Sequence, residues 1–198
     1  MQTLFLDLAS NQGSIACVAD DRVLATTTIN HRINDSELTG LLVGTLEKAG
    51  WTFKDLTQIA CVIGPGGFTS LRVGAAAANA LAFALKIPAA GIRLWELYEN
   101  RVAEKKCVWI HSTKKTQMFV HRFGDAGEPQ CIDLTALSAH VKSGDHYTGE
   151  LIPEHQKIAA EIGLVESKLA PIDEVLPQFL GLQIYKNETL VPWYGRGW

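Results

Sequence analysis

The chain has 198 residues, of which 47% are hydrophobic and 20% are charged, with a formal net charge of −3. This apolar content suffices for one large or two small folded domains and excludes a disordered chain. The acidic balance also excludes a protein that holds RNA or DNA tightly on its own. The small charged share favours a surface that is buried against a partner.

Strands and two helices are predicted over the first half of the chain. Apolar and β-branched runs between turn residues indicate strands, and apolar residues every three to four positions indicate helices. Asp35 or Ser36 is expected to cap the first helix. In chain order the predictions are strands at 3–8, 14–19 and 23–29, a helix at 38–49, a strand at 58–63, a helix at about 70–85 and a short strand at 88–92. This order is that of a ribonuclease-H-like lobe.

The second half has a weaker pattern. The pattern resets and charge rises near 93–105, so we expect a first lobe over residues 1–97 and a smaller one over 98–198, whose tail can return to the first lobe. The predicted elements are a helix at 95–103, paired strands at 107–110 and 117–123 around a polar turn at 112–116, short helices at 134–141 and 155–162, and a helix at 173–186.

Cysteine usage and the absence of a leader predict a cytoplasmic protein. Residues 1–7 lack the basic and apolar regions of a signal peptide. The longest weakly polar run, residues 73–85, is shorter than the ~20 residues of a bilayer span. Four cysteines without C-x-x-C spacing, each in its own apolar run, predict free thiols rather than disulfides or zinc ligands. These are Cys17, Cys61, Cys107 and Cys131.

A glycine-rich segment, Gly64-Pro-Gly-Gly-Phe-Thr-Ser-Leu-Arg-Val-Gly74, lies between a predicted strand and a predicted helix. Glycines let a phosphate or another backbone approach closely, and a helix start capped by Thr69 attracts anions. Two interpretations stay open, a phosphate or nucleotide contact and a simple turn into the helix. The segment matches neither the Walker A nor the G-x-G-x-x-G pattern. The candidate contact residues are Asp7, Gly64, Gly66, Gly67, Thr69, Ser70 and Arg72.

The helix after this segment is apolar on every face, with four consecutive alanines at 75–78. Such a helix is either buried in its own core or covered by another subunit. We favour an interface that it forms together with the helix at 38–49. The candidate interface residues are Leu38, Leu41, Leu42, Leu71, Gly74, Ala75, Ala78, Leu81 and Ala82.

Three segments resemble the TsaB (YeaZ) family. Residues 63–91 resemble its Gly-Pro-Gly-Ser-Phe-Thr-Gly-Leu-Arg-Ile-Gly block and alanine-rich helix, residues 4–16 its Leu-Ala-Ile-Asp-Thr-Ala start and Ser-Val-Ala strand, and residues 192–196 its terminal Pro-x-Tyr-x-Arg. The resemblance is strong over residues 1–92 and at the tail. It implies an α/β fold of two ribonuclease-H-like lobes of the actin, sugar-kinase and Hsp70 (ASKHA) type, with mixed sheets and packed helices.

The resemblance also implies a function in making N6-threonylcarbamoyladenosine in tRNA. In that pathway TsaD binds metal through a His-Met-Glu-Gly-His type motif and transfers the threonylcarbamoyl group. Residues 91–98 hold no histidine at the corresponding place, so we expect a non-catalytic subunit without a metal or catalytic residue of its own. The implied partners are TsaD and TsaE, with a homodimer through the same helices, tRNA reached only through the complex, and no membrane. No cofactor is required by this chain. Binding of ATP with magnesium to this chain, binding at a site shared with partners, and no nucleotide binding all stay open.

The sequence departs from the family pattern in two places and leaves an alternative open. Ser112-Thr-Lys-Lys-Thr-Gln-Met-Phe119 replaces Asp-Ala-Arg-x-Gly-Glu-Val-Tyr, and Asp35-Ser36-Glu37 replaces His-Ser-Glu. In ATPases of this fold an acid at the position of Asp7 helps hold magnesium, although Asp7 equally suits a cap on the Ala9-Ser10 turn. The alternative function is an actin-fold ATPase or kinase, or a glycoprotease-like hydrolase, acting on its own.

Overall fold

The computed structural model describes residues 1–31, 33 and 35–195. The chain forms two compact units: unit 1 contains Met1–Leu94 and Pro171–Tyr194, and unit 2 contains Trp95–Ala170 with Gly195. The predicted boundary after residue 97 thus lies three residues beyond the observed one. Residues 171–194, predicted as a helix and tail of the second lobe, belong to unit 1 because the last helix packs its apolar side on the unit 1 sheet.

Unit 1 is built on a five-stranded sheet with the order β3-β2-β1-β4-β5. The first three strands are antiparallel, and β4 and β5 run parallel to β1. A parallel strand needs a crossover, and helices provide it before β4 and before β5. The strands are β1 (Gln2–Asp7), β2 (Gly13–Ala19), β3 (Arg22–Ile29), β4 (Gln58–Gly64) and β5 (Ala89–Arg93).

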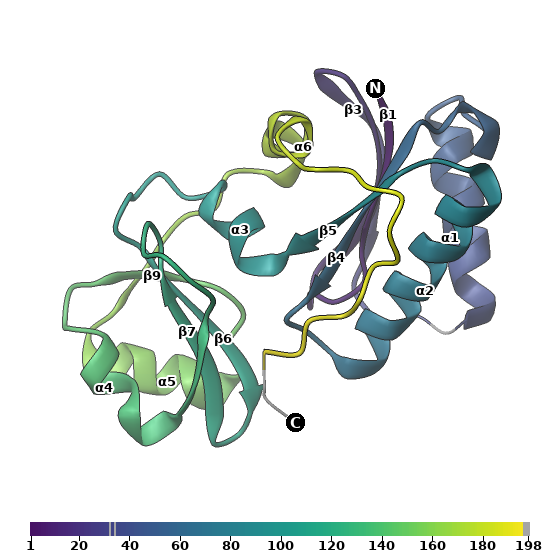
Figure 1. The fold of residues 1–198 in the computed structure, drawn as a ribbon. Coiled ribbons are helices and arrows are strands. Elements are labelled where there is room, and N and C mark those ends of the chain that lie inside the picture. The colour runs from purple at the N-terminus through teal and green to yellow at the C-terminus, as the bar shows by residue number, and fades with distance from the viewer. Residues whose placement is uncertain (32, 34, 196–198) are drawn as a thin grey trace. The chain divides into compact units, whose positions relative to one another are not determined.

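Three helices cover this sheet (Figure 1). Helix α1 (Asp35–Lys48) and helix α2 (Phe68–Leu85) lie on one face, and α6 (Ile172–Gly181) packs against β3 and β2 on the other. A short 3-10 turn, Phe53–Asp55, precedes β4. Leucines of α1 and alanines of α2 bury against the strand side chains in one apolar core. Because the Asp35 and Ser36 side chains lie outside the described residues, the predicted cap of α1 lies there too.

Unit 2 repeats the same topology with shorter elements. Its sheet has the order β10-β9-β6-β7-β8, with β6, β7 and β8 antiparallel and β9 and β10 parallel to β6. The strands are β6 (Val108–Lys114), β7 (Gln117–Arg122), β8 (Gln130–Asp133), β9 (His146–Thr148) and β10 (Val165–Glu166). The helices are α3 (Leu94–Glu99), the 3-10 turn Leu134–Ala136, α4 (Leu137–His140) and α5 (Pro153–Ile162). Two ribonuclease-H-like sheets confirm the predicted fold class.

Several predicted elements differ in detail from the structure. The prediction that Thr69 caps α2 is wrong, because Gly67 is the N-cap residue and Thr69 lies inside the first turn. The predicted helix at 173–186 ends at residue 181, where an irregular segment begins. Strand β6 continues to Lys114, which shortens the predicted polar turn of its hairpin. Strands β8, β9 and β10 were not predicted.

Helix α2, with 18 residues, is the one helix in the described part of the chain that is long and apolar enough to cross a bilayer. The predicted run of 73–85 was too short for this because the helix starts earlier, at Phe68. Core helices of soluble proteins meet the same criterion, and α2 packs against β4, β1 and β5. One such helix is therefore weak evidence for a membrane span.

The cysteines are free thiols, as predicted. Cys17, Cys61 and Cys107 are buried and Cys131 is half-buried. Burial raises the pKa of the Cys17 thiol to about 11, and a buried thiol with a raised pKa is chemically inert. The three buried cysteines therefore serve as small apolar core residues.

Candidate functional site

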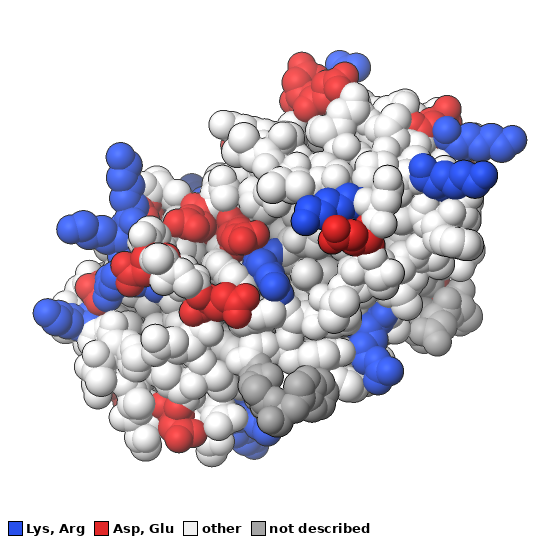
Figure 2. All heavy atoms as spheres, in the orientation of Figure 1, with Lys and Arg blue, Asp and Glu red and all other residues white. Residues whose placement is uncertain are grey.

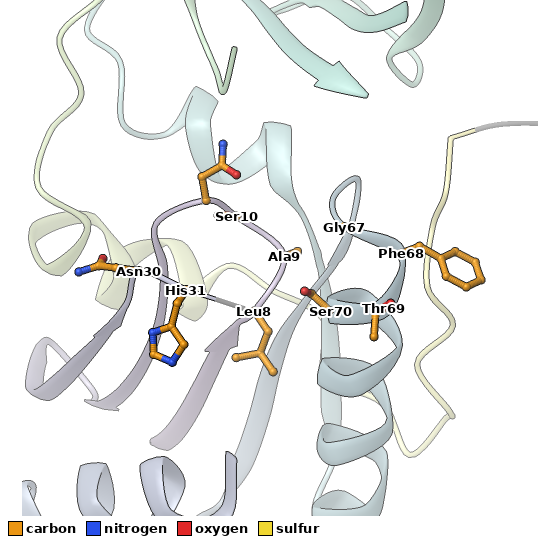
Figure 3. A pocket seen from close by; sticks show the side chains of 10 residues that line it. Leu8, Ala9, Ser10, Asn30, His31, Gly67, Phe68, Thr69 and Ser70 are labelled. Atoms are coloured by element: carbon orange, nitrogen blue, oxygen red, sulfur yellow. The ribbon is translucent and has the colours of Figure 1, made fainter. Parts of the chain in front are cut away.

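A pocket of about 400 Å³ opens in unit 1 beyond the carboxyl ends of β1 and β4 (Figure 3). Three segments form its wall: the β1–β2 loop, the residues after β3 and the first turn of α2. Ligands of open α/β sheets bind at this end of the strands, next to helix N-termini. The lining residues are Leu8, Ala9, Ser10, Asn11, Asn30, His31, Gly67, Phe68, Thr69 and Ser70.

Three of the predicted contact residues, Gly67, Thr69 and Ser70, line this pocket. They form the start of α2, where the first backbone N–H groups have no partner within the helix. Gly67 is exposed, and the nearest atom to the position of a Cβ there is the Ser70 hydroxyl oxygen at 3.6 Å. The arrangement fits an anionic group such as a phosphate.

Gly64 and Gly66 are required by close backbone approaches rather than by a ligand. Gly64 has φ +139°, and a Cβ atom there would lie 2.0 Å from the carbonyl oxygen of Trp193. A Cβ atom on Gly66 would lie 2.7 Å from the Cβ of Ala9 in the β1–β2 loop. For these two residues the structure favours the interpretation in which glycine shapes the chain.

The carboxylate of Asp7 caps the β1–β2 turn. Asp7 is buried, and its Oδ1 accepts hydrogen bonds from the backbone N–H groups of Ala9 at 3.0 Å and Ser10 at 3.1 Å. Its Oδ2 accepts a hydrogen bond from the Ser10 hydroxyl. The described residues that line the pocket include no Asp or Glu. The observed hydrogen bonds of Asp7 are those of the turn-capping interpretation.

Arg72 points along the outside of α2 instead of into the pocket. It is exposed, and its guanidinium lies 5.3 Å from the centroid of the Phe68 ring. The ring of Tyr194 stacks on Phe68 with a centroid distance of 5.1 Å. Arg72, predicted to contact phosphate, thus contacts the stacked rings of Phe68 and Tyr194 at the rim of the pocket.

Seven lining residues were not among the predicted contacts: Leu8, Ala9, Ser10 and Asn11 of the β1–β2 loop, Asn30 and His31 after β3, and Phe68. The register places Ile29 opposite Gly13, so the residues after β3 must lie beside the β1–β2 loop. The predicted hairpin of the second and third strands would have been enough to place Asn30 and His31 beside this loop. His31 Nε2 lies 2.7 Å from Glu37 Oε1 at the start of α1, which links the pocket wall to that helix.

Most of the predicted interface residues lie in the core of unit 1. Leu38, Leu42, Leu71, Ala75 and Ala78 are at most 6% exposed, so a partner cannot reach their side chains. Gly74 is buried too, with Cys61 Sγ 3.4 Å from the position of a Cβ atom. Leu41, Leu81 and Ala82 are partly buried against the same core. The interpretation of a buried core helix therefore holds for the inward face of α2.

The outward face of α2 carries a separate apolar stripe. Ala76 and Ala80 are exposed at a spacing of four residues, between Phe68, which is 53% exposed, and Phe83, which is 88% exposed. Residues four apart lie on one helix face. These four residues, called the α2 stripe below, leave apolar surface open to solvent. The exposed Arg72 lies on the same face between Phe68 and Ala76, so the continuous apolar part is the half around Ala76, Ala80 and Phe83.

In unit 2 the sequence segment that departs from the family pattern is tied to a buried histidine. The Ser112 hydroxyl lies 2.8 Å from His155 Nδ1, and His155 Nε2 lies 3.0 Å from the Lys115 carbonyl oxygen. The Ile152 N–H donates to the Ser112 hydroxyl at 3.0 Å. His155 is fully buried, so this set fastens the β6–β7 hairpin to the start of α5. In the part of the chain that the structure describes, no three His, Cys, Asp or Glu side chains gather as a candidate metal site.

Comparisons with known proteins agree with this fold. A family model described as "TsaD: tRNA N6-adenosine threonylcarbamoyltransferase" matches residues 29–183. Curated relatives with that enzyme name include those of Bacillus subtilis, 36% identical over 78 residues (38% of this chain, 22% of the relative), and Shouchella clausii, 39% identical over 70 residues (34% and 21%). The chain thus spans about a fifth of the length of the curated relatives it matches.

Two solved structures from Pseudomonas aeruginosa share the fold over nearly the whole chain. One is titled "YeaZ from Pseudomonas aeruginosa" and the other an "uncharacterized protein with similarity to peptidase YEAZ". Each has a TM-score of 0.73 at 18% identity and covers 98% of this chain and 99% of its own. At this identity the likeness shows the fold, and it confirms the predicted resemblance to TsaB (YeaZ) at that level.

Proposed function

We propose, from the premise that this chain belongs to the TsaD (tRNA N6-adenosine threonylcarbamoyltransferase) family, that it is a non-catalytic partner in forming threonylcarbamoyladenosine in tRNA. The YeaZ fold supports the partner role. So does the absence of histidine from residues 91–98, where the transferase carries its metal motif. In this proposal the chain binds TsaD and supports its activity in the cytoplasm, with TsaE as a further partner.

The α2 stripe is the observation that carries the partner role. Exposed alanines let another helix approach closely, and Phe83, which is 88% exposed, can anchor it at one end. An apolar surface of this kind on a folded unit is typical of an interaction site. We propose that the stripe binds TsaD and, without TsaD, a second copy of this chain.

We propose that tRNA and nucleotide are bound by the complex rather than by this chain alone. On the face that Figure 2 shows, Lys and Arg side chains are interspersed with Asp and Glu, without a broad basic area. Mixed charge of this kind offers little affinity for a phosphate backbone. The pocket at the start of α2 suits the phosphate of a nucleotide whose magnesium ion is held by a partner.

A charge placed on the α2 stripe tests the proposal. Ala80→Glu should weaken the complex with the cognate TsaD by about a hundredfold or more, because an unpaired charge in an interface is costly. Co-elution in size exclusion measures this, and circular dichroism checks that the variant is folded. The matched control is Ala160→Glu, the same change at an exposed position of α5, which should leave the complex intact.

Two results would overturn the proposal. If the wild-type chain and TsaD elute separately, the partner role fails. If Ala80→Glu binds as well as the wild type, the partner uses another surface. Hydrolysis of ATP by the isolated chain in the presence of magnesium, lost in Asp7→Asn, would favour the alternative of an independent ATPase. The engagement of the Asp7 carboxylate in the β1–β2 turn argues against that alternative.

A further inference from the structure

The last described residues of unit 1 form an irregular strap that runs beside α2 (Figure 1). Upstream, Lys186 pairs with Ala89 at the edge of β5, with hydrogen bonds in both directions between their backbones. The Asn79 side chain then donates to the Leu190 carbonyl at 3.0 Å and accepts from the Leu190 N–H at 2.8 Å. Asn79 therefore anchors the strap, residues 190–194, to the middle of α2.

The strap meets the glycine loop where β4 ends. The Trp193 N–H donates to the Ile63 carbonyl at 2.7 Å. The Trp193 carbonyl lies so close to Gly64 that any side chain there would collide with it. The Arg93 guanidinium lies over the Trp193 ring, 5.2 Å from its centroid, at the distance of a cation–π contact.

One residue later the strap reaches the wall of the pocket. Tyr194 stacks on Phe68, which lines the pocket, and Arg72 lies over the same Phe68 ring. Figure 3 shows the Phe68 side chain reaching out from the first turn of α2. The backbone of the glycine loop and a side chain of the pocket wall are thus both held by consecutive strap residues.

We propose that the strap is a clamp that fixes the glycine loop and the first turn of α2 in the conformation that forms the pocket. Asn79, Trp193 and Tyr194 are its positioning residues. Because strap residues 190–194 belong to no strand or helix, a few contacts hold them, and loss of one contact should release the loop. This inference concerns unit 1 alone and does not rest on the proposed partner role.

Hydrogen–deuterium exchange of the full chain tests the clamp. Asn79→Ala and Tyr194→Ala should each speed exchange in peptides covering residues 64–71 by about tenfold or more, since local opening sets the exchange rate. Exchange in β1 and β2 should stay at the wild-type rate. The matched control is Val191→Ala in the same strap, because the Val191 side chain is 69% exposed. It should leave residues 64–71 unchanged.

Two outcomes would overturn the clamp. In the first, residues 190–194 exchange faster in both variants while residues 64–71 keep the wild-type rate, so the strap merely passes over the loop. In the second, exchange rises equally throughout unit 1, so the strap is a general stabilising element. Tyr194→Ala keeps the test decisive if Asn79→Ala weakens α2 itself, since Tyr194 lies outside that helix.

Discussion

The two units share one strand topology but differ in the length of their strands and helices and in the side chains of their cores. Unit 1 has strands of five to eight residues and crossover helices of 14 and 18 residues. In unit 2 the two parallel strands have three and two residues, and α4 has four. The core of unit 1 is nearly all aliphatic on its helix side, whereas the buried residues of unit 2 include His111, His121, His155 and Trp109.

This difference shows that the same fold can be held together in two ways. Unit 1 relies on apolar area contributed by long elements. Unit 2 buries less regular structure and adds specific polar contacts, such as the pair of Ser112 and His155, which couple a hairpin to a helix. Polar contacts inside a core are costly when they are broken. Substitutions at matched places should therefore separate the two units.

The largest effect is expected at a pair of matched glycines. Gly64 ends β4 and Gly149 follows β9, the equivalent strand, and both have a positive φ. A Cβ atom on Gly149 would lie 2.0 Å from the carbonyl of Ile110 in the central strand β6. Gly149→Ala should cost about 4 kcal/mol in the free energy of unfolding, since β6 cannot move away. Urea denaturation measures this.

Gly64→Ala sharpens the same comparison. Its clash is with Trp193 in the strap, which can shift without opening the sheet. We expect a cost of about 2 kcal/mol, mainly from the unfavourable φ. Equal losses at the two glycines would contradict the view that the strap yields more easily than β6.

An effect of similar size is expected from the titration of His111 in unit 2. His111 is stacked on Trp109, and burial lowers its pKa to about 4 from an ordinary 6.5. Below pH 6.5 the His111 imidazole binds a proton in the unfolded chain but stays neutral in the folded chain. The free energy of unfolding is therefore unaffected by His111 above pH 6.5 and decreases as the pH falls from 6.5 toward 4.

His111→Phe removes this titration and keeps a ring against Trp109. Between pH 7.5 and 5 the loss of unfolding free energy should shrink by about 2 kcal/mol relative to wild type. Urea denaturation at both pH values measures it. Burial also lowers the pKa of His121, so part of the slope should persist. Met118→Leu, a buried change without a titrating group, should keep the full wild-type slope; an equal slope in His111→Phe would refute the assignment.

The smallest effect is expected from ion pairs. In unit 2, Arg122 Nη2 lies 2.8 Å from Asp145 Oδ2, which also accepts the Lys142 N–H at 3.0 Å. The hydrogen bond from Arg122 is the main cause that lowers the pKa of Asp145. Asp145→Asn should cost about 1 kcal/mol, and less in 1 M salt.

The counterpart in unit 1 is an exposed pair, Lys186 and Glu188, with 3.8 Å between Nζ and Oε2. Glu188→Gln should change the unfolding free energy by less than about 0.3 kcal/mol, because water screens such a pair. Thermal unfolding of both variants measures the difference. A loss at Glu188 as large as that at Asp145 would break the proposed contrast between the units.

The sequence predicted unit 1 well because its elements are long enough to show their period. Every strand and both crossover helices of that unit begin and end within a few residues of the expected positions. Strands as short as β9 and β10 cannot show alternation, so unit 2 was predicted only in outline. The α2 helix is apolar on both faces, and the sequence could not tell that Ala78 faces the core and Ala80 faces solvent.

The candidate site was predictable where one segment carries it and not where distant segments meet. Gly67, Thr69 and Ser70 followed from the glycine-rich motif. The roles of Gly64 and Phe68 depend on Trp193 and Tyr194, which lie more than a hundred residues later in the chain. No local pattern reports such a contact. The sequence predicted two alternative roles for Asp7, a magnesium ligand and a cap of the Ala9-Ser10 turn. The hydrogen bonds from Ala9 and Ser10 favour the cap.

The discontinuity of unit 1 has a consequence for synthesis on the ribosome. Unit 2 is nearly one continuous stretch, Trp95–Ala170, so it can fold as soon as that stretch has emerged. Unit 1 lacks α6 and the strap until residues 171–194 follow. At ~5–20 residues per second, synthesis from Leu94 to the end of α6 at Gly181 takes roughly 4–17 s, during which the side of the unit 1 sheet that α6 covers stays bare. A chaperone that shields apolar β-surface would act in that interval.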